Sequence, residues 1–327
     1  MAIYINGAKK VTGIFANING ETKKIVSAWA NKGGVPTKVF SNGMTPRFVA
    51  VGSSGTSHYS LDGETWVAMS GLDASTNYLG VTYGNNRLVC VGANSKSHYS
   101  IDGKTWVEME GLTVACSGVA YGNGRFVAVS QNSKAFYSID GETWVASTSP
   151  PSGAFGVAYG NGRFVCVGAS RAFYSTDGTR WVPMTGMESG VQYCGVSFGN
   201  GMFLCVGASG KSYYSLDGET WTAKSGLDTS TFYRAITFGR DNRFVCVGAS
   251  GKSHFKLDSE DWDFMLGLNT DITYMGVTYG NGRYVCVGAS GYSHYSLNGE
   301  TWKTMSGLDS VNYTGVCYSV DGGYGNK

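Results

Sequence analysis

The 327-residue sequence lacks the segments that define several large classes of protein. No stretch repeats its apolar residues with the period of an α-helix, which argues against a helical or mixed domain. There is no apolar run long enough to cross a membrane and no secretory signal at the start, so we expect folding in the cytoplasm. The formal net charge is +2 and the arginines do not cluster, which argues against nucleic-acid binding.

A tryptophan-containing motif is present seven times. Its tryptophans are 37 to 41 residues apart, a period typical of the four-stranded blades of a β-propeller. Within each period, short β-type stretches alternate with Asn-Gly or Asp-Gly pairs, which favour tight hairpin turns because these residues accept positive φ. The seven tryptophans are Trp66, Trp106, Trp144, Trp181, Trp221, Trp262 and Trp302.

The order of the repeated stretches predicts how the ring closes. The last copy of the first-strand motif begins at Tyr313, whereas the first copy of the second-strand motif begins at Arg47. The chain therefore enters a blade at its second strand, and residues 313–319 supply the missing first strand. We predict an all-β protein in which residues 41–327 form a seven-bladed β-propeller closed by the C-terminal strand, with a small β-rich module over residues 1–40 before it.

The segment that ends in each tryptophan also has a recurring sequence. Residues 60–66 read SLDGETW, and four further copies keep the Ser, Asp, Gly and Trp. These segments resemble the Asp-box hairpin of sialidase-type propellers, with one residue fewer between Asp and Gly. The resemblance implies a structural element that lies away from the catalytic face of that family. We expect each carboxylate to accept backbone N–H groups across its turn, and each indole to cover the neighbouring blade. The residues concerned are Asp62 and Trp66, Asp102 and Trp106, Asp140 and Trp144, Asp177 and Trp181, and Asp217 and Trp221.

No set of residues predicts catalysis, a metal site or a cofactor. Six arginines and four glutamates recur at fixed turn positions, which indicates a structural role. The four histidines share one repeat position that other repeats fill with Phe or Tyr, so packing of a flat ring explains them better than a shared zinc ion. The cysteines are expected to be buried, reduced thiols, including Cys116, Cys194 and Cys317 of the first strands. We predict that the protein is not an enzyme, although sequence alone leaves open that paired carboxylates meet in space.

Residues 1–40 follow a different pattern. An Asn-Gly or Gly-Gly motif followed by lysines occurs three times, and the segment has six Lys and one Glu, hence a net charge of +5. The pattern predicts three small β-hairpins or strand pairs, which are too small to bury a core alone and suit docking on another protein. The alternatives are a solvated basic arm and, less favoured, a nucleic-acid contact.

These short N-terminal repeats resemble those at the start of tail and other virion proteins of phages and prophages from Gram-positive bacteria. The resemblance implies that residues 1–40 attach the protein to other virion proteins and that the propeller faces outward. It also implies a virion location, with assembly in the host cytoplasm and without a signal peptide. A homo-oligomer is compatible with this attachment through residues 1–40.

Variable loops indicate where a ligand would bind. Turns on one face of the ring are nearly uniform, whereas loops on the other face differ in sequence. Arg234, beside Phe232, is the preferred ligand contact, because its repeat departs from the consensus at several points. Arg171 and Tyr292, in loops between second and third strands, are secondary candidates, together with Lys96, Lys134, Lys211 and Lys252. Five first-strand tyrosines either ring the channel mouth and contact a sugar or a protein, or are repeated packing residues. These are Tyr78, Tyr193, Tyr233, Tyr274 and Tyr313.

The sequence therefore favours a non-enzymatic phage virion protein, tail-associated or capsid-decorating. Its propeller is expected to bind a host surface glycan or a neighbouring virion protein. The alternatives are a bacterial carbohydrate-binding propeller outside any phage and, less favoured, a glycosidase.

Overall fold

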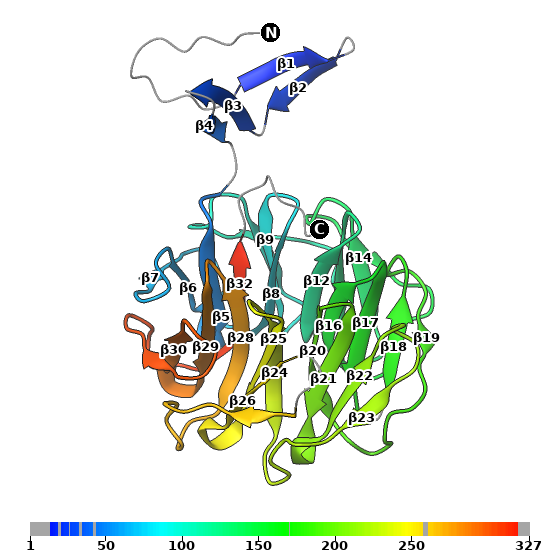
Figure 1. Ribbon diagram of the computed structural model, residues 1–327. Coiled ribbons are helices and arrows are strands. Elements are labelled where there is room, and N and C mark those ends of the chain that lie inside the picture. Colours follow the sequence, from blue (N-terminus) through cyan, green and yellow to red (C-terminus); the bar gives the residue numbers. More distant parts are fainter. Residues whose placement is uncertain are drawn as a thin grey trace.

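The structure, a computed structural model, describes residues 14–18, 21–25, 27–32, 35–41, 44–169, 171–257 and 261–319. The described parts of residues 44–319 contain short strands and four single-turn 3₁₀ helices, joined by turns and loops. Figure 1 shows these strands as sheets arranged around a central axis, which confirms the predicted all-β propeller. Within the described part of the chain, no helix has the length and apolar character needed to cross a membrane.

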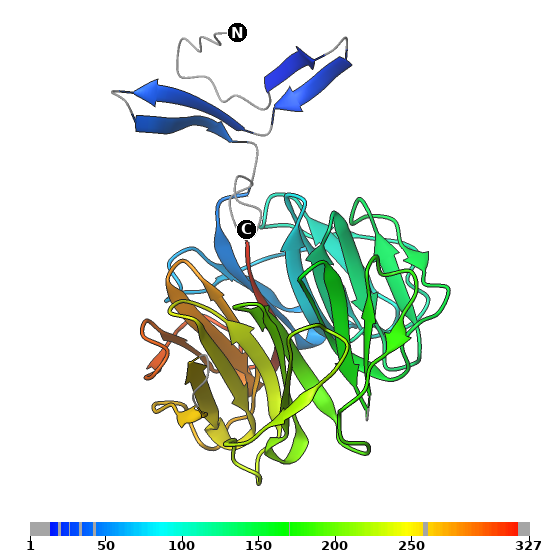
Figure 2. The same ribbon diagram turned by 45° about the vertical axis from the view of Figure 1, so that its right-hand side comes forward.

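Seven four-stranded antiparallel sheets, called blades 1 to 7, form the ring (Figures 1 and 2). In each blade the first strand lies nearest the axis and the fourth lies at the rim. Blade 1 contains β32 (Tyr313–Ser319), β5 (Arg47–Gly52), β6 (Ser57–Ser60) and β7 (Val67–Ala68). Blade 2 contains β8 (Tyr78–Gly84), β9 (Arg87–Gly92), β10 (Ser97–Ser100) and β11 (Val107–Glu108). Blade 3 contains β12 (Gly118–Gly122), β13 (Arg125–Val129), β14 (Ala135–Ser138) and β15 (Val145–Ala146).

The other four blades have the same strand order. Blade 4 contains β16 (Ala154–Gly160), β17 (Arg163–Gly168), β18 (Ala172–Ser175) and β19 (Val182–Pro183). Blade 5 contains β20 (Tyr193–Gly199), β21 (Met202–Gly207), β22 (Ser212–Ser215) and β23 (Thr222–Lys224). Blade 6 contains β24 (Tyr233–Phe238), β25 (Arg243–Gly248), β26 (Ser253–Leu257) and β27 (Asp263–Phe264). Blade 7 contains β28 (Tyr274–Gly280), β29 (Arg283–Gly288), β30 (Ser293–Ser296) and β31 (Lys303–Thr304). The 3₁₀ helices η1 (Ser53–Gly55), η2 (Ala208–Gly210), η3 (Ala249–Gly251) and η4 (Ala289–Gly291) follow the second strands of blades 1, 5, 6 and 7.

The C-terminal strand closes the ring as predicted. β32 pairs with β5 from Tyr313 opposite Gly52 to Ser319 opposite Arg47. The Ser319 hydroxyl accepts a hydrogen bond from the Arg47 N–H at 3.0 Å and donates one to the Arg47 carbonyl at 3.2 Å. The first and last strands of the ring therefore belong to one sheet, and no open blade edge faces a missing neighbour.

The ring has two faces of different character. Turns between first and second strands contain residues with positive φ, such as Asn123 (46°) and Gly124 (73°), as tight hairpins require. These turns and those between third and fourth strands form what we call the turn face. The loops between second and third strands and between blades form the loop face. Loop-face segments of neighbouring blades are joined by hydrogen bonds such as Gly55 N–H to the Thr76 carbonyl, at 2.8 Å.

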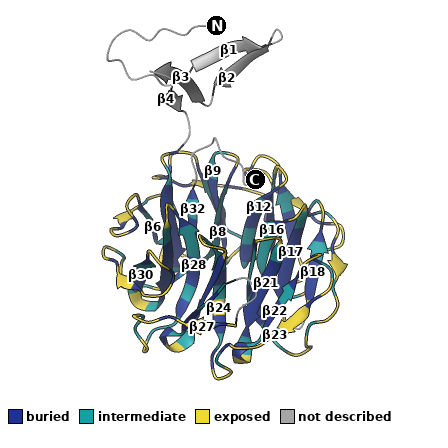
Figure 3. Ribbon diagram, in the orientation of Figure 1, coloured by how far each residue is buried: buried dark blue, intermediate teal, exposed yellow. Residues whose placement is uncertain are grey.

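The core consists of seven hydrophobic clusters between neighbouring blades. Between blades 2 and 3, for example, Val89 and Val91 lie against Phe126 and Ala128, and Trp144 closes the cluster. Figure 3 shows that the buried residues concentrate in the inner strands. All seven motif tryptophans are buried, and each belongs to a cluster with second-strand residues of the preceding blade, which confirms that they cover neighbouring blades.

The Asp hairpins have the predicted hydrogen bonds. In blade 5, Asp217 Oδ1 accepts from the N–H groups of Glu219 at 2.8 Å and Thr220 at 2.9 Å, and its Oδ2 accepts from the Thr220 hydroxyl at 2.8 Å. These bonds favour the ionised carboxylate and hold the pKa of Asp217 well below its usual range. Trp221, which follows Thr220 in the chain, donates its backbone N–H to the Thr185 carbonyl of blade 4 at 3.0 Å. The contacts recur at Asp62, Asp102 and Asp140, and in part at Asp177.

The repeated arginines connect neighbouring blades on the turn face. Arg283 of blade 7 pairs with Glu64 of blade 1 at 2.6 Å, and Arg47 of blade 1 donates to the Gly103 carbonyl of blade 2 at 2.8 Å. Each arginine also lies over an aromatic ring of its own third strand, as Arg47 does over Tyr59 at 4.8 Å. The structural role predicted for these arginines is therefore confirmed.

Two hairpins are described before the propeller. β1 (Ile14–Ile18) pairs with β2 (Glu21–Ile25), and β3 (Ser27–Lys32) pairs with β4 (Val35–Ser41). The β-rich module over residues 1–40 stays a prediction. The first predicted pair, which includes residues 5–10, lies outside the described residues.

Candidate recognition site at the channel mouth

One position of the first strand carries a different side chain in every blade. In six blades the pairing between first and second strands skips one residue there, as between Tyr233 and Ala235 in blade 6. Such a bulge leaves the extra residue unpaired and changes the direction of its side chain. The seven residues at this position, which we call the channel ring, are Leu79, Ser117, Phe155, Cys194, Arg234, Met275 and Thr314.

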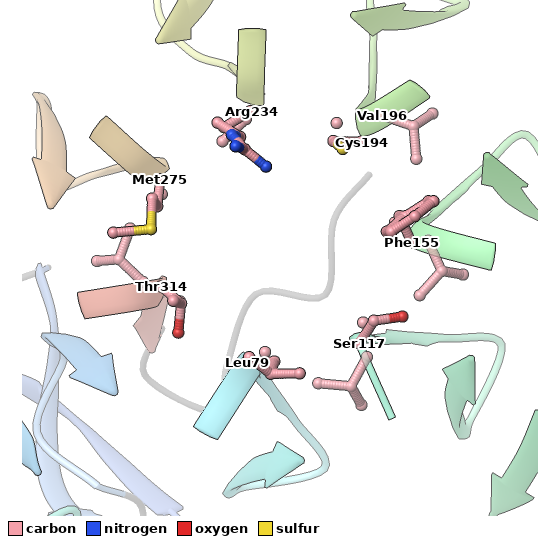
Figure 4. A pocket seen from close by; sticks show the side chains of 18 of the residues that line it. Leu79, Ser117, Phe155, Cys194, Val196, Arg234, Met275 and Thr314 are labelled. Carbon is pink, nitrogen blue, oxygen red and sulfur yellow. The ribbon is translucent and has the colours of Figure 1, made fainter. Parts of the chain in front are cut away.

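The channel ring surrounds a cavity of about 310 Å³ on the propeller axis (Figure 4). Gln131, from the loop after the second strand of blade 3, also lines it, which places the cavity at the loop-face end of the channel. Figure 4 shows Arg234, Phe155 and Met275 around the central space, each from a different strand. Sequence reasoning identified only Arg234 in this ring. The other six could have been found from the sequence, because the residue before the recurring first-strand glycine differs from repeat to repeat.

Glycines beside the channel ring allow the first strands to approach closely. A Cβ on Gly156 would lie 2.4 Å from the Cys194 carbonyl oxygen, and one on Gly118 would lie 2.9 Å from that of Phe155. Backbone contact between blades therefore sets the width of the channel. The seven variable side chains are presented on a frame that has little freedom to adjust.

Arg234 supplies the charge of this site. Its guanidinium lies 4.0 Å from the centre of the Phe232 ring, a distance typical of a cation–π contact. It also interacts with the Cys194 thiol, whose pKa burial raises to about 11. Cys194 is half-buried instead of buried as predicted, because the bulge directs it toward the channel. The other seven cysteines are buried, and none of the eight forms a disulfide.

The five first-strand tyrosines do not form the channel mouth. Each has an exposed fraction of 0%, so the structure assigns them to packing and not to ligand contact. The bulge explains the difference, because the residue after the tyrosine, and not the tyrosine, faces the axis. The buried tyrosines are Tyr78, Tyr193, Tyr233, Tyr274 and Tyr313.

Four of these tyrosines pair with the four histidines. The hydroxyl of Tyr233 lies 3.0 Å from His254 Nδ1, and that of Tyr78 lies 3.0 Å from His98 Nδ1. The Tyr78 hydroxyl also accepts the Asp73 N–H at 3.2 Å, so it connects a loop-face segment to the third strand. The histidines are buried, which agrees with the packing role predicted for them. The other two pairs are Tyr274 with His294 and Tyr313 with His58.

Burial of these histidines makes the stability of the ring depend on pH. Desolvation lowers the pKa of His254 and of His294 to about 4, whereas an unfolded histidine titrates near 6.5. The neutral form is favoured in the fold, so the stabilisation is complete above pH 6.5 and is lost as the pH falls toward 4. We expect each of the two to reduce the free energy of unfolding by roughly 1–2 kcal/mol between pH 7.5 and pH 5. Urea unfolding followed by tryptophan fluorescence measures this change.

Blade 3 provides the control for this prediction. There Cys116 and Phe136 occupy the positions of the Tyr–His pair. The double substitution Tyr233→Cys and His254→Phe copies this pair into blade 6, and should reduce the difference in unfolding free energy between the two pH values. An identical pH dependence in the double variant would contradict a contribution from His254.

The remaining sequence candidates lie outside the cavity. Arg171 and Tyr292 are exposed on the loop face, and neither lines the channel. Lys96 pairs with Glu108, Lys211 with Glu188, and Lys252 with Asp228. Phe232 is half-buried beneath Arg234. Of the predicted ligand contacts, the structure therefore brings only Arg234 to the channel, with Phe232 supporting it. No group of three or more His, Cys, Asp or Glu side chains within the described ranges is placed to hold a metal ion.

Comparisons at the level of sequence found no match. No protein-family model matches the sequence. No curated protein matches it either.

Several solved structures match the shape of the chain. YCF48 bound to a D1 peptide has a TM-score of 0.57 at 16% identity, covering 80% of this chain and 84% of that one. The virginiamycin B lyase of Staphylococcus aureus has a TM-score of 0.66 at 12% identity, with 75% and 92% covered. A nidogen/laminin complex contains a chain with a TM-score of 0.55 at 10% identity, with 84% and 99% covered. These similarities extend to the propeller fold, which carries different functions in the three proteins.

Proposed function

We propose that this chain is a non-enzymatic recognition protein of a phage virion. In this proposal the loop face, with the channel mouth at its centre, binds a host surface glycan or a neighbouring virion protein. Residues 1–40 attach the protein to the particle. The observation that carries the proposal is the channel ring, where seven different side chains occupy one position of an otherwise repetitive first strand. Packing alone would favour one residue type there, as it does at the buried second-strand positions.

The two ends of the propeller ring lie on the same face, which supports attachment to the particle from that face. Arg47 and Ser319, the first and last residues of the closing strand pair, lie opposite each other at the turn face. The loop face, on the other side of the ring, is therefore free for a ligand when the protein is attached through its N-terminal segment.

The composition of the cavity supports binding over catalysis. A glycosidase acts with a pair of carboxylic acids. The residues that the structure describes around the cavity include no Asp, Glu or His. The glycosidase therefore remains the less favoured alternative. YCF48 was solved with a D1 peptide and nidogen in a laminin complex, and these propellers support a protein ligand for the present ring.

Binding measurements with the full chain test this proposal. We expect saturable binding to a glycan array, to Gram-positive cell walls or to purified virion proteins. Arg234→Ala should weaken that binding by about tenfold or more, because a charge-assisted contact contributes roughly 1.5–3 kcal/mol. Arg180→Ala, at an exposed position in a hairpin of the turn face, should leave it unchanged. Deletion of residues 1–40 should abolish co-purification with particles and spare ligand binding.

Two results would reject this assignment. Cleavage of a bound glycan would identify an enzyme. Loss of binding with Arg180→Ala but not with Arg234→Ala would place recognition on the turn face.

A further inference from the structure

Among the residues that the structure describes around the channel mouth, Arg234 brings a positive charge and none brings a negative charge to balance it. Arg234 is exposed to the cavity, and its described contacts are the Phe232 ring and the Cys194 thiol. Neither partner is an anion, since burial raises the pKa of Cys194 to about 11 and keeps the thiol protonated at neutral pH. A guanidinium presents five N–H donors in a planar fork, which matches the two oxygens of a carboxylate.

The hydroxyl groups of the channel ring are already engaged. The Ser117 hydroxyl lies 2.8 Å from the Ala154 carbonyl and 3.3 Å from the Val129 carbonyl. The Thr314 hydroxyl donates to the Tyr78 carbonyl. Since each hydroxyl has one proton, neither has a donor left for a ligand. Arg234 is therefore the strongest hydrogen-bond donor that the channel ring offers.

Three residues of the channel ring are apolar. Leu79, Phe155 and Met275 lie around the same central space as Arg234 in Figure 4. Val and Ile side chains of the same first strands complete the lining. At about 310 Å³ the cavity is at the small end of ligand pockets, which range over roughly 300–1,000 Å³. It has room for the end of a chain and not for a folded segment.

We propose that the channel mouth binds the carboxyl-terminal end of a polypeptide, with the terminal carboxylate on Arg234 and an apolar last side chain between Phe155, Leu79 and Met275. This inference deepens the recognition role proposed above and rests on it. An acidic sugar would offer the same carboxylate, but its hydroxyl groups would need several further polar partners. Apart from Arg234, the described polar side chains of the lining are the Gln131 amide, the Cys194 thiol and the Ser117 and Thr314 hydroxyls, whose protons are already engaged. The other side chains of the lining are apolar, which favours a peptide.

A local probe inside the cavity tests this proposal. The full chain is prepared with ¹³C-methyl methionine, and the Met275 methyl signal is assigned from Met275→Leu. The protein is then titrated with an N-acetylated pentapeptide ending in Phe-Leu with a free carboxylate, and separately with the same peptide as its C-terminal amide. We expect the Met275 signal to shift saturably, with the carboxylate form binding about tenfold or more tightly than the amide. R234Q should bring the two affinities together, whereas R180Q should preserve the difference.

Each alternative outcome contradicts the inference in a recognisable way. Equal affinity for carboxylate and amide in the unsubstituted protein would remove the role assigned to Arg234. An unshifted Met275 signal at millimolar peptide would show that the cavity does not take a peptide end. A uronic-acid oligosaccharide that shifts Met275 at lower concentration than the peptide would identify a glycan site. In the last two cases, retained binding to cell walls or virion proteins would leave the recognition function standing while this inference fails.

Discussion

A chain that ends at residue 311 is expected to lose the cooperative unfolding transition of the intact ring. The truncation removes β32, which pairs with β5 and contacts the first strands of blades 2 and 7. It deletes the buried Tyr313 and Cys317 and uncovers apolar side chains of both neighbouring blades. Each large buried apolar side chain contributes roughly 1.5–3 kcal/mol, so the total loss approaches the stability of about 5–15 kcal/mol of a typical domain. Calorimetry and urea unfolding measure the effect.

A second truncation separates loss of the strand from loss of the chain end. A chain that ends at Ser319 keeps β32 and its hydrogen bonds to Arg47, and should keep its melting temperature within a few degrees. Adding a synthetic peptide of residues 312–319 to the shorter chain should restore part of the transition, because a free strand can pair with an exposed sheet edge. A melting temperature of the 311-residue chain close to that of the full protein would show that closure is not required.

The substitution Gly122→Ala is expected to destabilise the ring by about 3 kcal/mol or more, at the upper end of the cost of overpacking. A Cβ on Gly122 would lie 1.9 Å from Cγ of the Tyr159 ring in blade 4. Tyr159 cannot move away easily because its ring packs on Phe164, with the ring centres 4.8 Å apart. The two blades must therefore separate, or the first strand of blade 3 must shift. Urea unfolding gives the free-energy change directly.

Gly124 is the matched control, two residues away in the same hairpin. A Cβ there would meet nothing within 4 Å, but its φ of +73° is unfavourable for alanine. Gly124→Ala should thus cost only about 1 kcal/mol, from backbone strain alone. Removing the ring in the double variant Gly122→Ala with Tyr159→Ala should recover part of the stability lost in Gly122→Ala. Equal costs for the two glycine substitutions would show that packing between blades tolerates an added methyl group.

The repeat made most of the fold predictable from the sequence. The tryptophan spacing gave the number of blades, and the offset between Arg47 and Tyr313 gave the closing strand. The hydrogen bonds of the Asp hairpin were also predictable, because Asp217 and its equivalents accept from N–H groups only two or three residues away in the chain. Structural features that depend on local sequence or on a regular repeat can therefore be predicted from the sequence alone.

The channel ring was less predictable because it depends on a bulge. One extra residue in the first strand reverses the faces of the side chains, so the first-strand tyrosines, which the sequence allowed either at the mouth or as packing residues, are buried. A correlated pattern did carry information about that burial. Tyrosine occurs in the first strand where the third strand has His or Tyr, whereas Cys116 and Ala154 stand opposite Phe136 and Phe173. When the residues at two repeat positions change together in this way, their side chains are expected to pack against each other. The direction of Arg234 into the cavity had no comparable signal.

The closing strand also has a consequence for how the chain is synthesised. Arg47 and Ser319, which hydrogen-bond in the finished ring, are 272 residues apart in the sequence. At about 5–20 residues per second, the ribosome needs roughly 15–55 s to cover that distance. During this interval the strand that begins at Arg47 has no inner neighbour, and six complete blades emerge before its partner does. The slowest contact to form during biosynthesis is thus the one that joins the two ends of the ring.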